Sequence, residues 1–333
     1  MWSRATSPCT ASSVAESIHE LVAPERAGRL DKWVAESIGV SRARVSALVT
    51  AGHVTVDGQP GKSAKKLRGG EVVCVVVPEP PTSRLIQQDI AVPILFEDDD
   101  VLVVDKPAGL VVHPAKGHPD GTLVNAVFDK LDPHCGHAER PGIVHRLDKG
   151  TSGVMCVART QRAYDSLTAQ FAAHTVERTY RALCWGYAKK NSGTIEAPLG
   201  RHPKDRKRYA VVNGGKRAVT HWKAVERFRF KIPGSEGWAT WFECRLETGR
   251  THQVRVHLSD LGHPLIGDPM YTRPTYKPRT QLPTALREAI GPIDHQLLHA
   301  VSLGLVHPVS GERVFRESDP PEDYQRVLDL LRG

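Results

Sequence analysis

One acidic side chain between two cations is the strongest candidate for chemistry in this chain of 333 residues. Asp148 lies between Arg146 and Lys149, and a Gly-Thr-Ser-Gly segment follows directly. Nearby positive charge favours the ionised form of a carboxyl group, and a buried charge is costly unless it is paired. An ionised Asp148 can act as a nucleophile or as a general base.

Two apolar segments must position this acidic loop. Residues 143–144 precede it, and residues 154–158 (VMCVA) follow it with the length and composition of a buried strand. Loops that are held by a rigid scaffold commonly carry catalytic residues. We therefore predict that Asp148 lies in a loop fixed by a buried strand.

Length and charge indicate the kind of partner. A chain of 333 residues is expected to form one large domain and one small one. Of the net charge of +8, residues 26–71 contribute +5, with nine Lys or Arg and four Asp or Glu. This concentration favours a nucleic acid over a membrane, and no apolar run approaches the roughly 20 residues of a spanning helix.

Cysteine usage and the N-terminal composition indicate the compartment. The six cysteines are scattered without a C-x-x-C pair, which fits a reducing cytoplasm. Residues 134–137 (HCGH) lack a second ligand pair at zinc spacing, so we expect no metal. Residues 1–25 are rich in Ser, Thr and Ala without an apolar core, which predicts a flexible tail and not a secretory signal.

The basic segment has the pattern of a small α/β module. Apolar spacing predicts helices over residues 30–38 and 41–49, with Ser41 as the N-cap of the second. Strands are expected at residues 53–56 and 71–77. Charge runs are usually solvated surface, but here positive charges outnumber negative ones about two to one. The candidate RNA-binding residues are Arg29, Lys32, Arg42, Arg44, Lys62, Lys65, Lys66 and Arg68.

Three short motifs in this module resemble the S4 RNA-binding domain. They are residues 29–31 (RLD), 41–44 (SRAR) and 52–58 (GHVTVDG), and the resemblance spans residues 26–77. It implies recognition of RNA by shape and phosphate, not by base edges. The Pro-rich start of the next segment predicts a linker over residues 78–90, followed by a second domain over residues 91–333.

The second domain alternates strand-like runs with amphipathic helices. Helices are expected after Thr122 and over residues 164–171, and residues 269–292 are expected to form a basic insertion loop. The segment around Arg255 fits both a helical and a strand pattern. The expected strands are residues 101–104, 154–158, 176–185, 220–230 and 238–246.

Three longer motifs, in a fixed order, resemble the RluA-type RNA pseudouridine synthases. They are residues 145–153 (HRLDKGTSG), 177–182 (ERTYRA) and 246–258 (LETGRTHQVRVHL), extended by 262–269 (GHPLIGDP) and 298–300 (LHA). Residues 119–126 (PDGTLVNA) and the module in front are most similar to the RluD subgroup, which modifies large-subunit ribosomal RNA. The resemblance implies an α+β fold with a mixed, mainly antiparallel sheet and flanking helices.

The same resemblance implies roles for individual residues. Asp148 would act on the sugar of a flipped-out uridine, and Arg146 would fill the space that the nucleotide leaves. Tyr180 would stack on the uracil, and Arg255 would pair with Asp148. His145 and Leu147 would lie beside them in the substrate site. The isomerisation needs no redox partner, so no cofactor is expected.

Other interpretations of these residues remain open. Tyr180 alone would be a core aromatic, Arg255 alone a structural cation, and the histidines at 145, 252 and 257 structural hydrogen-bonding groups. An RNA-binding protein without activity and a nucleoside or glycoside hydrolase are alternative functions, although such a hydrolase usually needs a second carboxylate. We expect a cytoplasmic monomer that acts on ribosomal RNA or on the pre-ribosomal large subunit.

Overall fold

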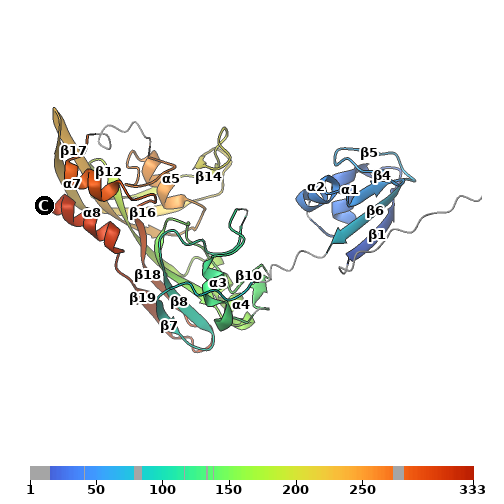
Figure 1. The fold of residues 1–333 in the computed structure, drawn as a ribbon, viewed down its shortest axis with the longest axis horizontal. Coiled ribbons are helices and arrows are strands. Elements are labelled where there is room, and N and C mark those ends of the chain that lie inside the picture. The colour runs from blue at the N-terminus through green and yellow to red at the C-terminus, as the bar shows by residue number, and fades with distance from the viewer. Residues whose placement is uncertain are drawn as a thin grey trace, which may run out of the picture. The chain divides into compact units, whose positions relative to one another are not determined.

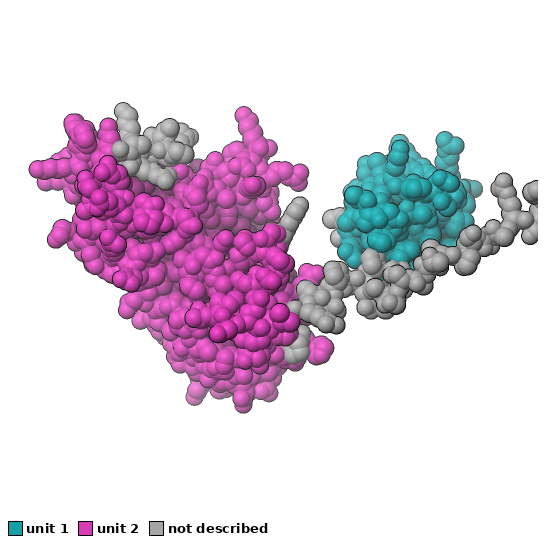
Figure 2. Space-filling view, viewed as in Figure 1, with its two compact units in different colours: residues 1–84 teal, residues 85–333 magenta. Residues whose placement is uncertain are grey.

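The computed structural model describes residues 16–40, 42–78, 85–115, 117–132, 134–137, 139–272 and 281–333. The chain forms two compact units, residues 1–84 and residues 85–333 (Figure 2). The predicted N-cap Ser41 lies outside the described residues, as do residues 273–280 of the predicted insertion loop. Within the described ranges, no helix is both long and apolar enough to cross a membrane.

The first unit is a four-stranded antiparallel sheet with two helices (Figure 1). The strand order is β1-β6-β3-β4, and a separate short pair joins β2 to β5. Leu30, Val34, Val45 and Leu48 are buried together, so the apolar spacing that predicted both helices also builds the core of the unit. The elements are β1 (Glu16–Val22), β2 (Gly28–Arg29), α1 (Leu30–Ser37), α2 (Arg42–Thr50), β3 (Val54–Val56), β4 (Gln59–Pro60), β5 (Lys66–Leu67) and β6 (Val72–Pro78).

The prediction of a flexible tail over residues 1–25 is wrong for residues 16–22. They form β1, which pairs with β6 along its whole length, from Glu16 opposite Pro78 to Val22 opposite Val72. The strand is at the edge of its sheet, and Ile18 and Val22 remain 65% and 67% exposed. The stability of β1 therefore comes from backbone pairing with a distant segment. Such pairing produces no apolar pattern in the sequence of the strand itself.

The second unit is built on one nine-stranded sheet, which confirms the predicted fold class. Its strands run in the order β13-β16-β17-β12-β18-β11-β8-β7, with β19 paired to β18. All of these pairs are antiparallel except β11 with β18. The strands of this sheet are β7 (Ile94–Glu97), β8 (Val101–Lys106), β11 (Ser152–Ala158), β12 (Glu177–Trp185), β13 (Ser192–Glu196), β16 (Val219–Ile232), β17 (Ser235–Leu246), β18 (Leu298–Val306) and β19 (Arg313–Glu317).

Helices cover both faces of this sheet. Residues of α3 and α5 pack with Tyr180 and Ala182 on one face, while α7 and α8 pack with Leu183 and Trp185 on the other. A separate apolar cluster packs α4 against β8, β11 and the later part of β18. The remaining elements are α3 (Leu123–Val127), the 3-10 turn η1 (Phe128–Lys130), β9 (Gly136–His137), β10 (Arg140–Pro141), α4 (Gln161–Ala172), β14 (Leu199–Arg201), β15 (Tyr209–Val211), α5 (Gln253–Asp260), α7 (Thr284–Ile290) and α8 (Glu322–Arg332).

The structure corrects two predicted segments of this unit. Residues 85–90 are part of the fold and not of a linker, because Leu85 is buried and the Gln88 N–H donates to the Asn125 carbonyl oxygen. Residues 269–292 are not simply an insertion loop. Tyr271 is buried near Asp148, and residues 284–290 form α7, which packs on α8.

Candidate active site

The loop that carries Asp148 is tied to its surroundings at several points. The Lys106 ammonium, which is fully buried, donates to the carbonyl oxygens of Pro107 (2.8 Å), Leu110 (2.8 Å) and Lys149 (3.3 Å). The Gly109 N–H also donates to the Lys149 oxygen, at 2.8 Å. These bonds hold the peptide that follows Asp148. Gly109 therefore shapes the loop.

A glycine allows the next strand to begin beside its parallel neighbour. Gly153 has a φ of +113°, and a Cβ atom at this position would lie 2.3 Å from the backbone oxygen of Ala300 in β18. Glycine is the residue that accepts both the positive φ and the close approach. The parallel pairing of β11 with β18 thus depends on the Gly-x-x-Gly segment that follows Asp148.

A chain of charged groups fixes the carboxylate of Asp148. Arg255 donates from Nη1 to Asp148 Oδ2 at 2.9 Å. The same guanidinium donates to both oxygens of Asp268, from Nε at 2.8 Å and from Nη2 at 3.0 Å. Burial disfavours the Arg255 cation, but the hydrogen bonds and charges of Asp268 and Asp148 outweigh it and raise the pKa of Arg255 further. The predicted pairing of Arg255 with Asp148 is present, and the structure places Arg255 in a helix, α5.

His252 lies on the other side of the same carboxylate. Its Nε2 is 3.9 Å from Asp148 Oδ1, and its Nδ1 is 2.8 Å from the Tyr271 hydroxyl. Burial lowers the pKa of His252, so the ring is neutral near pH 7. Its φ of +58° is rare for a residue with a side chain, and such strain is often found at functional sites. His252 therefore orients the site without adding charge to it.

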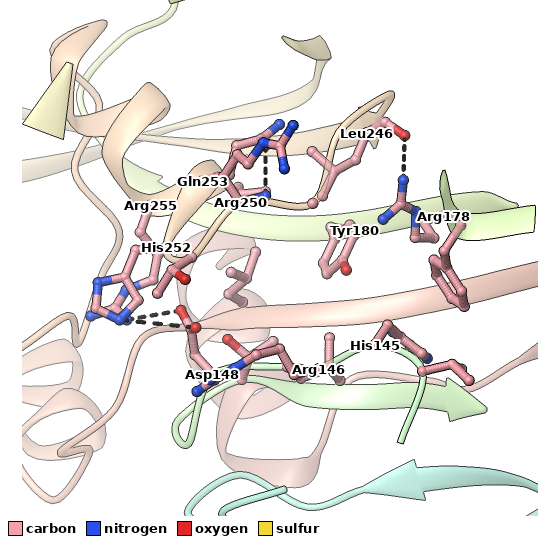
Figure 3. A pocket seen from close by; sticks show the side chains of 18 of the residues that line it. His145, Arg146, Asp148, Arg178, Tyr180, Leu246, Arg250, His252, Gln253 and Arg255 are labelled. Atoms are coloured by element: carbon pink, nitrogen blue, oxygen red, sulfur yellow. Dashed lines mark hydrogen bonds and ion pairs between the residues drawn. The ribbon is translucent and has the colours of Figure 1, made fainter. Parts of the chain in front are cut away.

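The pocket above Asp148 has a volume of about 370 Å³. Tyr180 lines it from β12, and Figure 3 shows its ring between Asp148 and Arg178. The Tyr180 hydroxyl has no hydrogen-bond partner among the described residues, and burial raises the pKa of this phenol. Tyr180 is thus a neutral ring that can stack on a flat ligand and exchange a proton with it.

Arg178 forms the far end of this pocket. It is 8% exposed, and Nη2 donates to the carbonyl oxygens of Leu246 (3.3 Å) and Glu247 (3.1 Å). Its Nε is buried without a hydrogen-bond partner in the described part of the chain. Arg178 lies two residues before Tyr180 on β12, so its buried cation faces the same pocket.

The three residues before Asp148 lie at different depths. Arg146 is exposed at the pocket, with no ion pair to any described residue. Leu147 is buried in the core beneath the pocket. The His145 ring accepts a hydrogen bond from the Cys156 N–H at 3.1 Å, and burial lowers its pKa to about 3. His145 is therefore a neutral structural group at the wall of the pocket.

The basic residues of the first unit differ in how firmly they are held. The buried Asp31 carboxylate accepts hydrogen bonds from Arg29 (3.0 and 2.9 Å) and Arg42 (2.9 Å), which hold its pKa well below the usual range. Both arginines are thereby fixed beside each other while about half of each side chain stays exposed. Lys32 lies 3.9 Å from Glu36, and Arg44 is partly buried. The exposed cations of the connection before β6 are Lys62, Lys65, Lys66 and Arg68.

The structure adds three residues to the site that the sequence did not single out. Asp268 supports Arg255, Tyr271 supports His252, and Arg178 closes the pocket. Asp268 and Arg178 lie within segments already matched to a family motif, so the motifs contained the signal. Tyr271 had no such signal in the sequence, because it follows those motifs in a segment that was predicted to be a loop.

Family models and named relatives match most of this chain. Residues 100–260 match the model of the family "RNA pseudouridylate synthase", and residues 28–73 match the S4 domain. A ribosomal large subunit pseudouridine synthase D from Xanthomonas campestris is 45% identical over 319 residues, 95% of this chain and 93% of the relative. One with the same name from Pseudomonas aeruginosa is 42% identical over 305 residues, 91% of this chain and 92% of the relative.

Solved structures share the fold of this chain. Human RNA Pseudouridylate Synthase Domain Containing 1 aligns with a TM-score of 0.53 and 25% identity, over 73% of this chain and 86% of that one. The full-length sequence similarity and the matched family model lead to one conclusion. The chain belongs to the RNA pseudouridine synthase family and carries an S4 domain ahead of its synthase domain.

Proposed function

We propose that this protein converts uridines of large-subunit ribosomal RNA to pseudouridine, with Asp148 as the group that acts on the ribose. The observation that carries the proposal is the Asp148 carboxylate, 2.9 Å from the buried Arg255, in a pocket that also holds the Tyr180 ring. The family membership supplies the reaction, and the relatives named for the large ribosomal subunit supply the substrate class.

The reaction exchanges one bond for another without changing the composition of the RNA. The C1′–N1 bond breaks, the uracil turns, and a C1′–C5 bond forms, while C5 loses a proton and N1 gains one. Asp148 would serve this sequence by attacking C1′ or by removing a proton from the sugar. Arg255 holds the carboxylate ionised in either case.

The other pocket residues would handle the flipped nucleotide. Taking a base out of its stack costs a few kcal/mol, and base–aromatic stacking returns about 1–3 kcal/mol. Tyr180 would provide that stacking surface, and the exposed Arg146 would occupy the vacated space in the RNA. Asp148 is the sole carboxylate among the described residues that line the pocket, which disfavours a hydrolase with two carboxylates.

The partners and the setting follow from the same proposal. The S4 domain would hold the RNA through Arg29, Arg42 and the exposed cations before β6, with contacts to phosphates. We propose that the protein works as a monomer in the cytoplasm, where ribosomal RNA is modified. Sedimentation of the purified protein checks the oligomeric state.

The test maps pseudouridine in a large-subunit ribosomal RNA transcript by carbodiimide treatment and reverse transcription. Wild type should produce stops at specific uridines, and Asp148→Asn should produce none while binding the RNA within a few-fold of wild type. Asp260→Asn, at the exposed end of α5, makes the same chemical change away from the pocket and should retain the stops. Full activity of Asp148→Asn would refute the role of Asp148, and release of free uracil by wild type would indicate a hydrolase.

A further inference from the structure

A second groove, of about 440 Å³, opens beside the pocket that holds Asp148. We propose that it binds the single-stranded RNA next to the target uridine, through phosphates and one stacked base. The hairpin of β14 and β15 forms one wall, and residues 214–216 and 249–251 complete the groove. Residues 249–251 also line the first pocket, so the two cavities adjoin. The inference rests on the proposed function and adds where the RNA next to the target uridine runs along the protein.

The hairpin concentrates positive charge at this groove. Residues 201–217 contain seven Lys or Arg and a single acidic residue, Asp205. The Asp205 carboxylate accepts the Lys207 N–H at 3.0 Å, so it shapes the turn. Of the seven cations, only Arg217 forms an ion pair with a described carboxylate, with Glu196 and Glu247. The other six leave a positive potential that attracts a polyanion.

An aromatic ring lies among these cations. The Tyr209 ring is half-buried in the groove, and the guanidinium carbon of Arg201 lies 4.7 Å from its centroid. Bases of single-stranded RNA stack on aromatic rings and on Arg guanidinium planes. A flat pair of this kind, in a groove that Lys216 and Arg250 also line, fits a base with its flanking phosphates better than it fits an acidic protein surface.

Glycines leave the backbone of the groove uncovered. Gly200, Gly214, Gly215 and Gly249 all line it, so few side chains obstruct a phosphodiester chain that approaches the protein. Arg250 lies where the groove meets the first pocket, and its Nε donates to the Arg217 carbonyl oxygen at 3.1 Å. Figure 3 shows Arg250 across the pocket from Arg146. A strand that leaves the pocket on this side passes Arg250 and then enters the groove.

Hydrogen bonds fasten the hairpin to the active site. The Tyr209 N–H donates to the Tyr271 hydroxyl oxygen at 2.9 Å, and that hydroxyl lies 2.8 Å from His252 Nδ1. His252 Nε2 in turn lies 3.9 Å from Asp148 Oδ1. An RNA strand bound along the hairpin is thus held in a defined position relative to the reacting carboxylate.

A charge test compares two triple variants of the full chain. Lys204→Gln, Arg206→Gln and Lys207→Gln remove three exposed cations of the hairpin. Lys223→Gln, Lys231→Gln and Arg326→Gln remove three exposed cations from β16 and α8, and so change the net charge equally. Kd for the ribosomal transcript is measured against salt. In a plot of the logarithm of the binding constant against the logarithm of the salt concentration, the hairpin variant should have a slope about 2 smaller in magnitude than wild type, at about 0.7 per phosphate contact. The control variant should keep the slope of wild type. Equal slopes for the two variants would overturn the proposal.

A stacking test uses Tyr209. Tyr209→Leu should weaken binding about 5- to 150-fold, the range for the loss of one base–aromatic stack, whereas Tyr209→Phe should bind like wild type. Tyr187→Leu removes another exposed tyrosine, beside Trp238, and should have no effect. Equal binding by Tyr209→Leu and Tyr187→Leu would refute the stacked base.

The activity of the wild-type protein distinguishes failure of the groove proposal from failure of the proposed function. Pseudouridine formation with unchanged slopes in the hairpin variant would overturn the groove alone. Absence of pseudouridine with wild type would overturn the proposed function, and with it the identity of the strand.

Discussion

Asp268 holds Arg255 with both carboxylate oxygens, at 2.8 Å from Nε and 3.0 Å from Nη2. A two-point pair fixes the plane of the guanidinium as well as its position. Nη1 is the remaining nitrogen, and it lies 2.9 Å from Asp148. The orientation of the Asp148 carboxylate therefore depends on Asp268, whose side chain is fully buried and lies behind Arg255.

This relationship predicts that Asp268 is a positioning residue. Asp268→Asn should lower kcat by about 10- to 100-fold with little change in KM, because a small displacement of a catalytic group costs up to about 10²-fold. Single-turnover kinetics on the ribosomal transcript measure the effect, with Asp260→Asn as the control. A purely structural role would instead change the amount of folded protein and leave kcat per folded molecule unchanged.

Tyr180 should show two separable contributions. Tyr180→Phe is expected to keep RNA affinity and slow the reaction, because the hydroxyl faces the pocket unpaired and stays protonated at neutral pH. Tyr180→Leu should also weaken binding, since it removes the stacking surface, worth about 1–3 kcal/mol. Binding and single-turnover rates distinguish the two. A wild-type rate for Tyr180→Phe would leave stacking as the sole role.

The buried Lys106 makes stability depend on pH. Burial lowers its pKa from 10.5 to about 7, so between these values the unfolded chain binds more protons than the folded one. The free energy of unfolding contributed by this group should therefore rise with pH from about 7 to about 10.5, by at most about 1.4 kcal/mol per pH unit. Denaturant unfolding of wild type and Lys106→Met at pH 7.5, 8.5 and 9.5 should show a difference that changes with pH. Parallel curves would contradict the low pKa.

The first unit should contribute to RNA affinity more than to the isomerisation reaction. Removing residues 1–78 is expected to weaken RNA binding and to reduce its salt dependence. The slope of log binding constant against log salt concentration should fall in magnitude by about 0.7 to 0.9 for each lost phosphate contact. The second unit has its own sheet and core, so the shortened protein should still form pseudouridine at high RNA concentration. An unchanged slope would show that the S4 domain does not contact this RNA.

Local patterns in the sequence determined the parts of the fold that bury continuous apolar surface. The run at residues 154–158 is β11, buried at every position, and the amphipathic spacing at 164–171 lies within α4. Thr122 begins α3 as its N-cap and accepts the Asn125 N–H. In each case the signal and the structure depend on neighbours a few residues apart.

Motif order determined the family and the candidate residues Asp148, Tyr180 and Arg255, because each motif is a short run of residue types that can be recognised without the fold. It did not determine how they are held. Whether Arg255 belongs to a helix or a strand was open in the sequence, and packing of Val254 and Leu258 against the sheet decided for the helix.

Tertiary structure alone decided the features that rest on long-range contacts. The edge strand β1 exists because β6, more than 50 residues later, supplies its hydrogen-bond partners. Tyr271 joins the hairpin to His252, and Asp268 supports Arg255 from across a turn. Charge pairs and hydrogen bonds between distant segments have no local periodicity, so the sequence named the candidate residues while the folded chain decided their orientation and partners.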